Sequence, residues 1–140
     1  MTCALCAAQK EEFRIVTQTQ HSFAIVNHEP LKAGHVMVLP LRHARTLAAL
    51  TPAEAKDLLD LVEHIQKILL KIFSEDPLVM MNTGKHSTEE HVHIHVVPSK
   101  GNLRALIASY EGVAQRQKQE AKKLQEMRDQ IVRLLEQNLS

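Results

Sequence analysis

Three histidines alternate with apolar residues in the segment 91–98, and no other feature constrains the fold of this chain as much. The histidines are His91, His93 and His95. In a β-strand successive side chains point to opposite faces of the sheet. The alternation therefore predicts a strand with three imidazoles on one face and valine or isoleucine on the other, ending at Pro98.

A row of three imidazoles has two specific chemical interpretations. Neutral imidazoles can converge on a zinc ion and leave one position for water. Alternatively, one imidazole attacks phosphorus while its second ring nitrogen is held as N–H by an acceptor. In that case His93, in the middle, would attack, and the histidines on either side would handle charge. The least specific alternative is a polar strand face with surface histidines.

Length and composition favour one ordinary globular domain. The chain has 140 residues, 44% hydrophobic and 24% charged, so it can bury a core. The formal charge of +1 produces no net electrostatic field that would attract a nucleic acid or an anionic membrane as a partner. The N-terminus lacks a basic region before an apolar run, and no apolar run has the roughly 20 residues that span a bilayer. A cytoplasmic location is expected.

The order of predicted elements indicates an α+β fold with one antiparallel sheet. β-prone runs cover residues 13–17, 22–26, 35–39, 78–81 and 91–97. A helix is predicted from Thr51, an N-cap followed by Pro52 and by Glu54 in a capping box, to Phe73.

The segment 103–140 is predicted to be a helical extension of a domain that covers residues 1–102. Apolar residues recur in it at steps of three and four, and Gly112 is a possible break. The stripe includes Leu124, Met127, Ile131 and Leu135. Packing on its own domain and a contact in a dimer are both open interpretations.

Cys3 and Cys6 are the two cysteines of the chain, three positions apart. In a reducing compartment this spacing is typical of half a metal site or of a redox pair. Two buried small hydrophobic residues are the alternative.

The segment 91–98 resembles the signature of the histidine triad (HIT) family, nucleotide hydrolases and transferases. The segments 22–27 and 34–42 are similar to the fragile-histidine-triad branch, the dinucleoside polyphosphate hydrolases. The resemblance implies an antiparallel sheet with one central helix, here followed by a long C-terminal helix. It also implies cleavage at the α-phosphate of dinucleoside polyphosphates or nucleoside phosphoramidates through a nucleotidylated histidine, with no organic cofactor. A catalytically weak nucleotide-binding or interaction module of the same fold is the alternative.

The resemblance also implies residue roles. His93 corresponds to the nucleophile, His91 to the first histidine of the triad, and His95 to the third, which contacts phosphate. His35 resembles a buried histidine that supports the catalytic strand. Asn27 corresponds to the ligand of the ribose hydroxyls, although a turn residue after the strand is the simpler interpretation.

The loop 82–90 departs from the family pattern, because it lacks the usual Gly-Gln pair and is shorter. Asn82 matches the polar residue that begins the loop, and Thr88 keeps a hydroxyl that could bind an α-phosphate oxygen. Glu89 and Glu90 would weaken polyphosphate binding unless their side chains face away. The leaving group is therefore left open.

Zinc-carrying bacterial members of the family resemble this chain in an N-terminal Cys-x-x-Cys pair. The resemblance implies a structural zinc site made by Cys3, Cys6, His43 and His91. Two thiolates and two imidazoles make a closed tetrahedral site. His91 would then be structural rather than catalytic.

Similar family members form homodimers through the helix and strand that correspond to residues 51–73 and 78–81. The resemblance therefore implies a homodimer. The extension 103–140 would add to that interface or cover the nucleotide groove.

Overall fold

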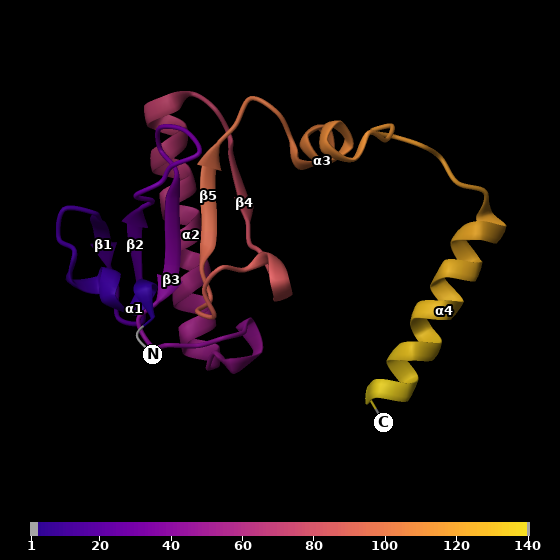
Figure 1. Cartoon of the computed structure of the whole chain (residues 1–140), viewed down its shortest axis with the longest axis horizontal. Coiled ribbons are helices and arrows are strands. Elements are labelled where there is room, and N and C mark those ends of the chain that lie inside the picture. The colour runs from indigo at the N-terminus through magenta and orange to yellow at the C-terminus, as the bar shows by residue number, and fades with distance from the viewer. Residues whose placement is uncertain (1–2, 140) are drawn as a thin grey trace. The chain divides into compact units, whose positions relative to one another are not determined.

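Within residues 3–139, which the computed structural model describes, five strands form one antiparallel sheet in the order β1-β2-β3-β5-β4 (Figure 1). The strands are β1 (Ile15–Gln18), β2 (Ser22–Val26), β3 (Val36–Pro40), β4 (Pro77–Met80) and β5 (Ile94–Pro98). The chain divides into two compact units, one ending at Asn102 and one beginning at Leu103. In the described part of the chain, no helix is long and apolar enough to cross a membrane.

Helix α2 (Pro52–Phe73) covers one face of the sheet (Figure 1). The predicted capping box is confirmed: the Thr51 side chain accepts from the Glu54 N–H, and the Glu54 carboxylate accepts from the Thr51 N–H. The Arg42 guanidinium at the end of β3 donates to the same carboxylate and is the first of several causes that lower the pKa of Glu54 to about 2. The core below the helix is aliphatic and contains Leu58, Leu61, Val62, Ile65, Leu69, Val36, Val38, Ile94 and Val96.

The opposite face of the sheet is partly covered by the N-terminal segment. This segment forms α1 (Ala4–Ala7) and the 3-10 turn η1 (Ala8–Lys10), neither of which the sequence patterns predicted. Leu5 and Ala8 pack with the side chains of β2 and β3 that face this side, namely Phe23, Ile25, Met37 and Leu39. Cys3 and Cys6, at the start of this segment, contact His91, which precedes β5.

Strand β5 is shorter than predicted, because regular pairing begins at Ile94 and not at His91. Antiparallel pairing with β3 reaches Val38 opposite Ile94, and continuing the register by two residues would place Pro40 opposite Val92. Proline has no N–H to donate to a ladder. The Val92 N–H instead donates to the Ala44 carbonyl at 2.7 Å, so the first two histidines of the triad lie outside the regular strand.

The second unit contains two helices, and the first of them ends at the break that the sequence indicated at Gly112. They are α3 (Leu103–Glu111) and α4 (Ala121–Leu139). Helix α3 ends at Gly112, whose φ of 68° lies in the left-handed region, and the Val113 N–H donates back to the Ala108 carbonyl. This is the geometry of a glycine C-cap, and it explains the break. In α4 the apolar stripe is about half exposed, at 50–57%, for Leu124, Met127, Ile131, Leu134 and Leu135.

Candidate active site and metal cluster

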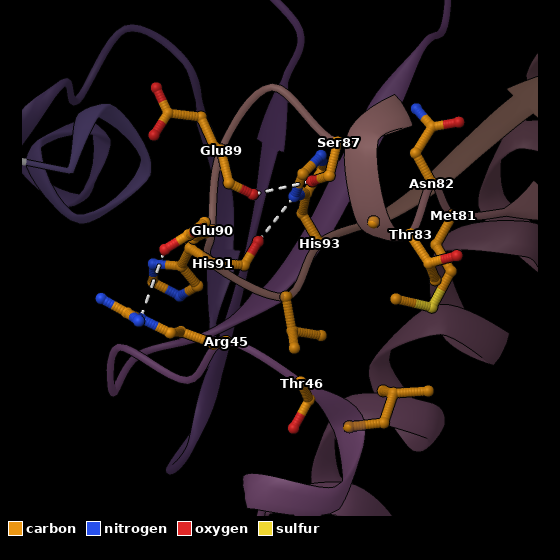
Figure 2. A pocket seen from close by; sticks show the side chains of 13 residues that line it. Arg45, Thr46, Met81, Asn82, Thr83, Ser87, Glu89, Glu90, His91 and His93 are labelled. Carbon is orange, nitrogen blue, oxygen red and sulfur yellow. Dashed lines mark hydrogen bonds and ion pairs between the residues drawn. The ribbon is translucent and has the colours of Figure 1, made fainter.

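His93 is held in one tautomer by the main chain two residues before it (Figure 2). Its Nδ1 lies 2.6 Å from the carbonyl oxygen of His91. A carbonyl oxygen can only accept, so Nδ1 carries the proton and Nε2 keeps a free lone pair. The side chain is 7% exposed. This is the arrangement that a nucleophilic imidazole needs.

His35 fixes the tautomer of His95 through a chain of three groups. The Leu31 N–H donates to His35 Nδ1 at 3.1 Å, so the His35 proton must be on Nε2. That N–H donates to His95 Nδ1 at 2.8 Å, which leaves the His95 proton on Nε2. Burial lowers the pKa of His35, and burial together with the neighbouring His93 and His35 lowers the pKa of His95 to about 4. Both rings are neutral at pH 7.

Two cavities flank the His93–His95 pair. The first has a volume of about 510 Å³ and is lined by His93, by the loop 82–90 and by residues 45–47 before α2 (Figure 2). The second, of about 370 Å³, is lined by His35, His95, Glu29, Leu31 and Met80. Met81 and Asn82 line both cavities. The predicted site residue Asn82 therefore lies where the two cavities meet.

The structure places two other predicted substrate ligands outside both linings. Asn27 closes a turn, with its Oδ1 accepting from the Glu29 N–H at 2.8 Å, and its Nδ2 lies 3.5 Å from His35 Nε2. Thr88 is exposed and lines neither cavity. Its neighbour Ser87 lines the first cavity and donates from Oγ to the Glu89 carbonyl at 2.8 Å. The hydroxyl at position 87 was visible in the sequence, but the backbone turn decides which of the two adjacent hydroxyls faces inward.

Arg45 is a second cavity residue that the sequence patterns did not single out. Its Nε lies 3.4 Å from a carboxylate oxygen of Glu90 (Figure 2). Both side chains line the first cavity. An isolated arginine before a helix has no local signature, so only the fold brings it beside the triad.

The four predicted metal ligands come together, and their ligating atoms all lie within 4.8 Å of one another. The thiol of Cys6 lies 3.4 Å from His43 Nδ1 and 3.3 Å from His91 Nδ1, and the Cys3 thiol lies 3.5 Å from His91 Nδ1. Tetrahedral zinc with bonds of about 2.3 Å to sulfur and about 2.1 Å to nitrogen separates those atoms by roughly 3.6 Å. The donor set and its spacing therefore fit a structural zinc ion.

The second nitrogen of His91 supports this fit. His91 Nε2 lies 3.0 Å from the Pro40 carbonyl, to which it donates, so Nδ1 is free to act as a ligand. Burial, followed by the adjacent Cys3 thiol, raises the pKa of Cys6, and a divalent cation would favour the thiolate form. The side chain of His91 faces the cysteines, while its carbonyl holds His93.

A family model described as "HIT domain" matches residues 8–102 of the chain, the part that contains the sheet, α2 and the triad. The chain belongs to the histidine triad family. The resemblance noted in the sequence is thereby confirmed.

Curated relatives of this HIT protein carry two kinds of enzyme name. It is 34% identical over 90 residues to an asymmetrical bis(5′-nucleosyl)-tetraphosphatase of Schizosaccharomyces pombe, covering 62% of this chain and 50% of that one. It is 31% identical over 102 residues to an adenosine 5′-monophosphoramidase of the same organism, covering 70% and 74%. A bis(5′-adenosyl)-triphosphatase of Dictyostelium discoideum is 38% identical over 85 residues. The chain spans about half the length of the two polyphosphate hydrolases that it matches, 50% and 57%.

Solved structures agree with the fold of the HIT protein. A histidine triad nucleotide-binding protein from Candida albicans superposes with a TM-score of 0.71 over 97% of this chain and 99% of that chain, at 20% identity. A zinc-bound histidine triad family protein from Mycobacterium smegmatis gives 0.63 over 74% and 79%, at 23% identity. The predicted α+β class is confirmed.

Proposed function

We propose that the protein is a nucleotide hydrolase or transferase that cleaves at the α-phosphate of dinucleoside polyphosphates or nucleoside phosphoramidates. The observation that carries the proposal is the bond from His93 Nδ1 to the His91 carbonyl, because in the neutral ring this bond leaves a lone pair on Nε2, and His93 lines a cavity. The enzyme names of the relatives are consistent with this activity.

The proposed reaction has two displacements at phosphorus. The His93 Nε2 lone pair forms a bond to the α-phosphorus while the bond to the leaving group breaks, and the leaving atom departs with the electron pair and a proton from water. In the second step the oxygen of a water molecule attacks phosphorus, and the histidine–phosphorus bond breaks with its electron pair returning to Nε2. The attacking water releases one proton to solvent, which replaces the proton taken up by the leaving group in the first step. Transfer to another nucleophile in place of water would make the enzyme a transferase.

His95 would act in this reaction as a hydrogen-bond donor rather than as an acid. A neutral imidazole with its proton on Nε2 can donate to a phosphate oxygen as charge accumulates there, without losing the proton. His35 would be a positioning residue that keeps His95 in that tautomer. We assign substrate contacts to Asn82, Asn27 and Thr88, of which only Asn82 already lines a cavity.

Trapping of the covalent intermediate tests the proposal. Intact-mass and peptide mass spectrometry after rapid acid quenching with adenosine 5′-phosphoramidate should show a nucleotidyl group on His93. His93→Ala should abolish turnover and leave nucleotide binding within about tenfold, since most contacts remain. His64→Ala, an exposed histidine on α2, is the matched control and should keep full activity. An adduct at another residue would overturn the assignment of His93.

The altered loop 82–90 supports one alternative, a nucleotide-binding module with little turnover. In that case calorimetry would detect binding of adenosine monophosphate, while no adduct and no product would form. The same quenching experiment therefore separates the two functions.

We also propose that Cys3, Cys6, His43 and His91 hold one structural zinc ion. When bound, the ion would cross-link the N-terminal helical segment to the residues that precede β5. Thiolate ligands stay reduced in a cytoplasm, which is where we place the protein.

A homodimer is the assembly we propose. Helix α2 and strand β4 would form the interface, and Ile68, Ile72 and Val79 are exposed apolar side chains on these elements. Residues 103–140 would be a helical extension distinct from the HIT domain of residues 1–102 and would add its α4 stripe to the assembly.

A further inference from the structure

We infer that Glu90, balanced by Arg45, makes the enzyme select nucleoside phosphoramidates with a positively charged amine leaving group over substrates with an anionic leaving group. The inference rests on the proposed function, because it concerns the group that leaves when His93 attacks. Such a preference would also distinguish activity on phosphoramidates from activity on dinucleoside polyphosphates, the two kinds of activity in the names of the relatives.

The first cavity is the side of the site that receives the leaving group. The second cavity contains His35, whose Nε2 lies near the side chain of Asn27, the proposed ribose ligand. The nucleoside would therefore extend from the triad toward the second cavity. The first cavity is the remaining space beside His93, and it is built from the loop 82–90 and residues 45–47.

The charges around these cavities are unfavourable for a polyphosphate. Within the described chain, the side chains that line them include one cation, Arg45, against three carboxylates, Glu29, Glu89 and Glu90. The two basic residues of the loop, Lys85 and His86, are exposed on the 3-10 turn η3 (Gly84–His86) and line neither cavity. A leaving group with several negative charges thus meets no uncompensated positive charge.

Glu90 is the acidic residue that would act on the leaving group. Glu89 has its carboxylate turned away from His93, whereas Glu90 faces Arg45 at the rim of the cavity (Figure 2). The Arg45–Glu90 contact is a single approach of 3.4 Å between side chains that are 72% and 75% exposed. Such an exposed ion pair is weak, so Glu90 remains free to attract a cation on the substrate.

The expected size of the effect follows from the size of the cavity. A volume of 510 Å³ corresponds to a space of roughly 10 Å across, about one Debye length at physiological ionic strength. A charge pair in water at such a distance changes a rate by about twofold for each unit of charge before screening by salt. Selectivity should therefore be modest and should decrease at high salt.

The chemical step is the one proposed above with nitrogen as the leaving atom. The His93 Nε2–phosphorus bond forms as the phosphorus–nitrogen bond breaks, and the amine nitrogen takes the electron pair and a proton from water. The ammonium group at the far end of a diamine leaving group takes no part in the chemistry. It would lie near Glu90 and would act only through its charge.

Three adenosine 5′-phosphoramidates of nearly equal size test the inference: those of ethylenediamine, propylamine and β-alanine, whose free ends are cationic, neutral and anionic. We expect kcat/KM to fall in that order, by about fourfold between the two charged members at low salt. Glu90→Gln should bring the ratio to one or below, because Arg45 then has no acidic partner, and Arg45→Gln should increase it. Glu12→Gln, an exposed carboxylate that lines neither cavity, is the control and should leave the ratio as in the wild type.

The outcomes separate the inference from the proposed function. If no phosphoramidate is turned over and His93 carries no adduct, the proposed function fails. If all three substrates are hydrolysed at equal rates, or if Glu90→Gln leaves the ratio unchanged, the function stands and the role of Glu90 is wrong.

Discussion

The Nε2 atom of His35 lies 2.8 Å from the Nδ1 atom of His95, and this contact determines where the His95 proton is. The Leu31 main chain orients His35, and His35 orients His95. The residue that precedes His35, Gly34, has a φ of 87° in the left-handed region, and a Cβ at this position would clash with the Phe73 ring, so glycine is required there. Two residues 60 positions apart are thereby coupled at the active site.

Replacement of His35 should change the tautomer of His95. His35→Leu removes the donor to His95 Nδ1, so the proton should distribute between both ring nitrogens and kcat should fall by about tenfold or more. His35→Gln, whose amide can still donate, should retain more of the activity. Nitrogen-15 shifts of the His95 ring report the tautomer directly. An unchanged ring spectrum in the leucine variant would contradict the relay.

Acid should destabilise the fold through the same pair. The pKa of each histidine is lowered in the folded state, so both are neutral there, whereas the unfolded chain binds protons below about pH 6.5. Their contribution is full above pH 6.5 and is lost as the pH falls through the lowered folded-state pKa of each ring, which is about 4 for His95, with a slope of up to about 1.4 kcal/mol per pH unit for each ring. Urea unfolding of the wild type and of a His35→Gln/His95→Gln variant at several pH values isolates this component. Parallel curves would show that the pair does not contribute.

Metal removal should destabilise the HIT domain. A protein purified without chelator or histidine tag should contain one zinc per chain, and its Tm should fall after chelation and recover on reconstitution. Cys6→Ser and His43→Asn should lower the zinc content, while His64→Asn should not, because His64 is on α2 and outside the cluster. Less than about 0.2 zinc per chain after reconstitution would exclude the site.

The start of α2 should be sensitive to its cap. Thr51→Ala removes the side chain that accepts from the Glu54 N–H and should reduce the free energy of unfolding by about 1 kcal/mol. Thr46→Ala is a matched control, because the Thr46 side chain makes no cap bond at the 3-10 turn η2 (Leu47–Ala49) that follows it. Equal losses in both variants, measured by denaturant unfolding, would show that the cap adds nothing.

The C-terminal extension should contribute to assembly. Light scattering on the full chain and on a version ending at Gly101 should give a weaker dimer for the shorter chain, since the half-exposed stripe of α4 needs a covering surface. A change of Leu124 and Ile131 to serine in the full chain should have the same effect. Dimers of equal stability and activity in all three proteins would make the extension dispensable for assembly.

The class of fold, the extent of α2 and the members of the Cys/His cluster follow from the sequence alone. The fold class and the extent of α2 rest on local chemistry: a capping box is complete within four residues, and a strand needs only its alternation and a terminating proline. Cys3, Cys6, His43 and His91 are residue types with few other reasons to occur together, so the resemblance was sufficient to predict the cluster.

The division of the triad between two sites was implied by the resemblance, and the packed chain supplies its physical reason. Pro40 ends the ladder opposite the triad, so the His91 side chain turns to the cysteines while its carbonyl holds His93. The tautomers of His35 and His95, the inward position of Ser87 and the approach of Arg45 to Glu90 depend on contacts between distant segments. Local patterns carry no information about such contacts, because hydrogen-bond direction and charge pairing are properties of the packed chain.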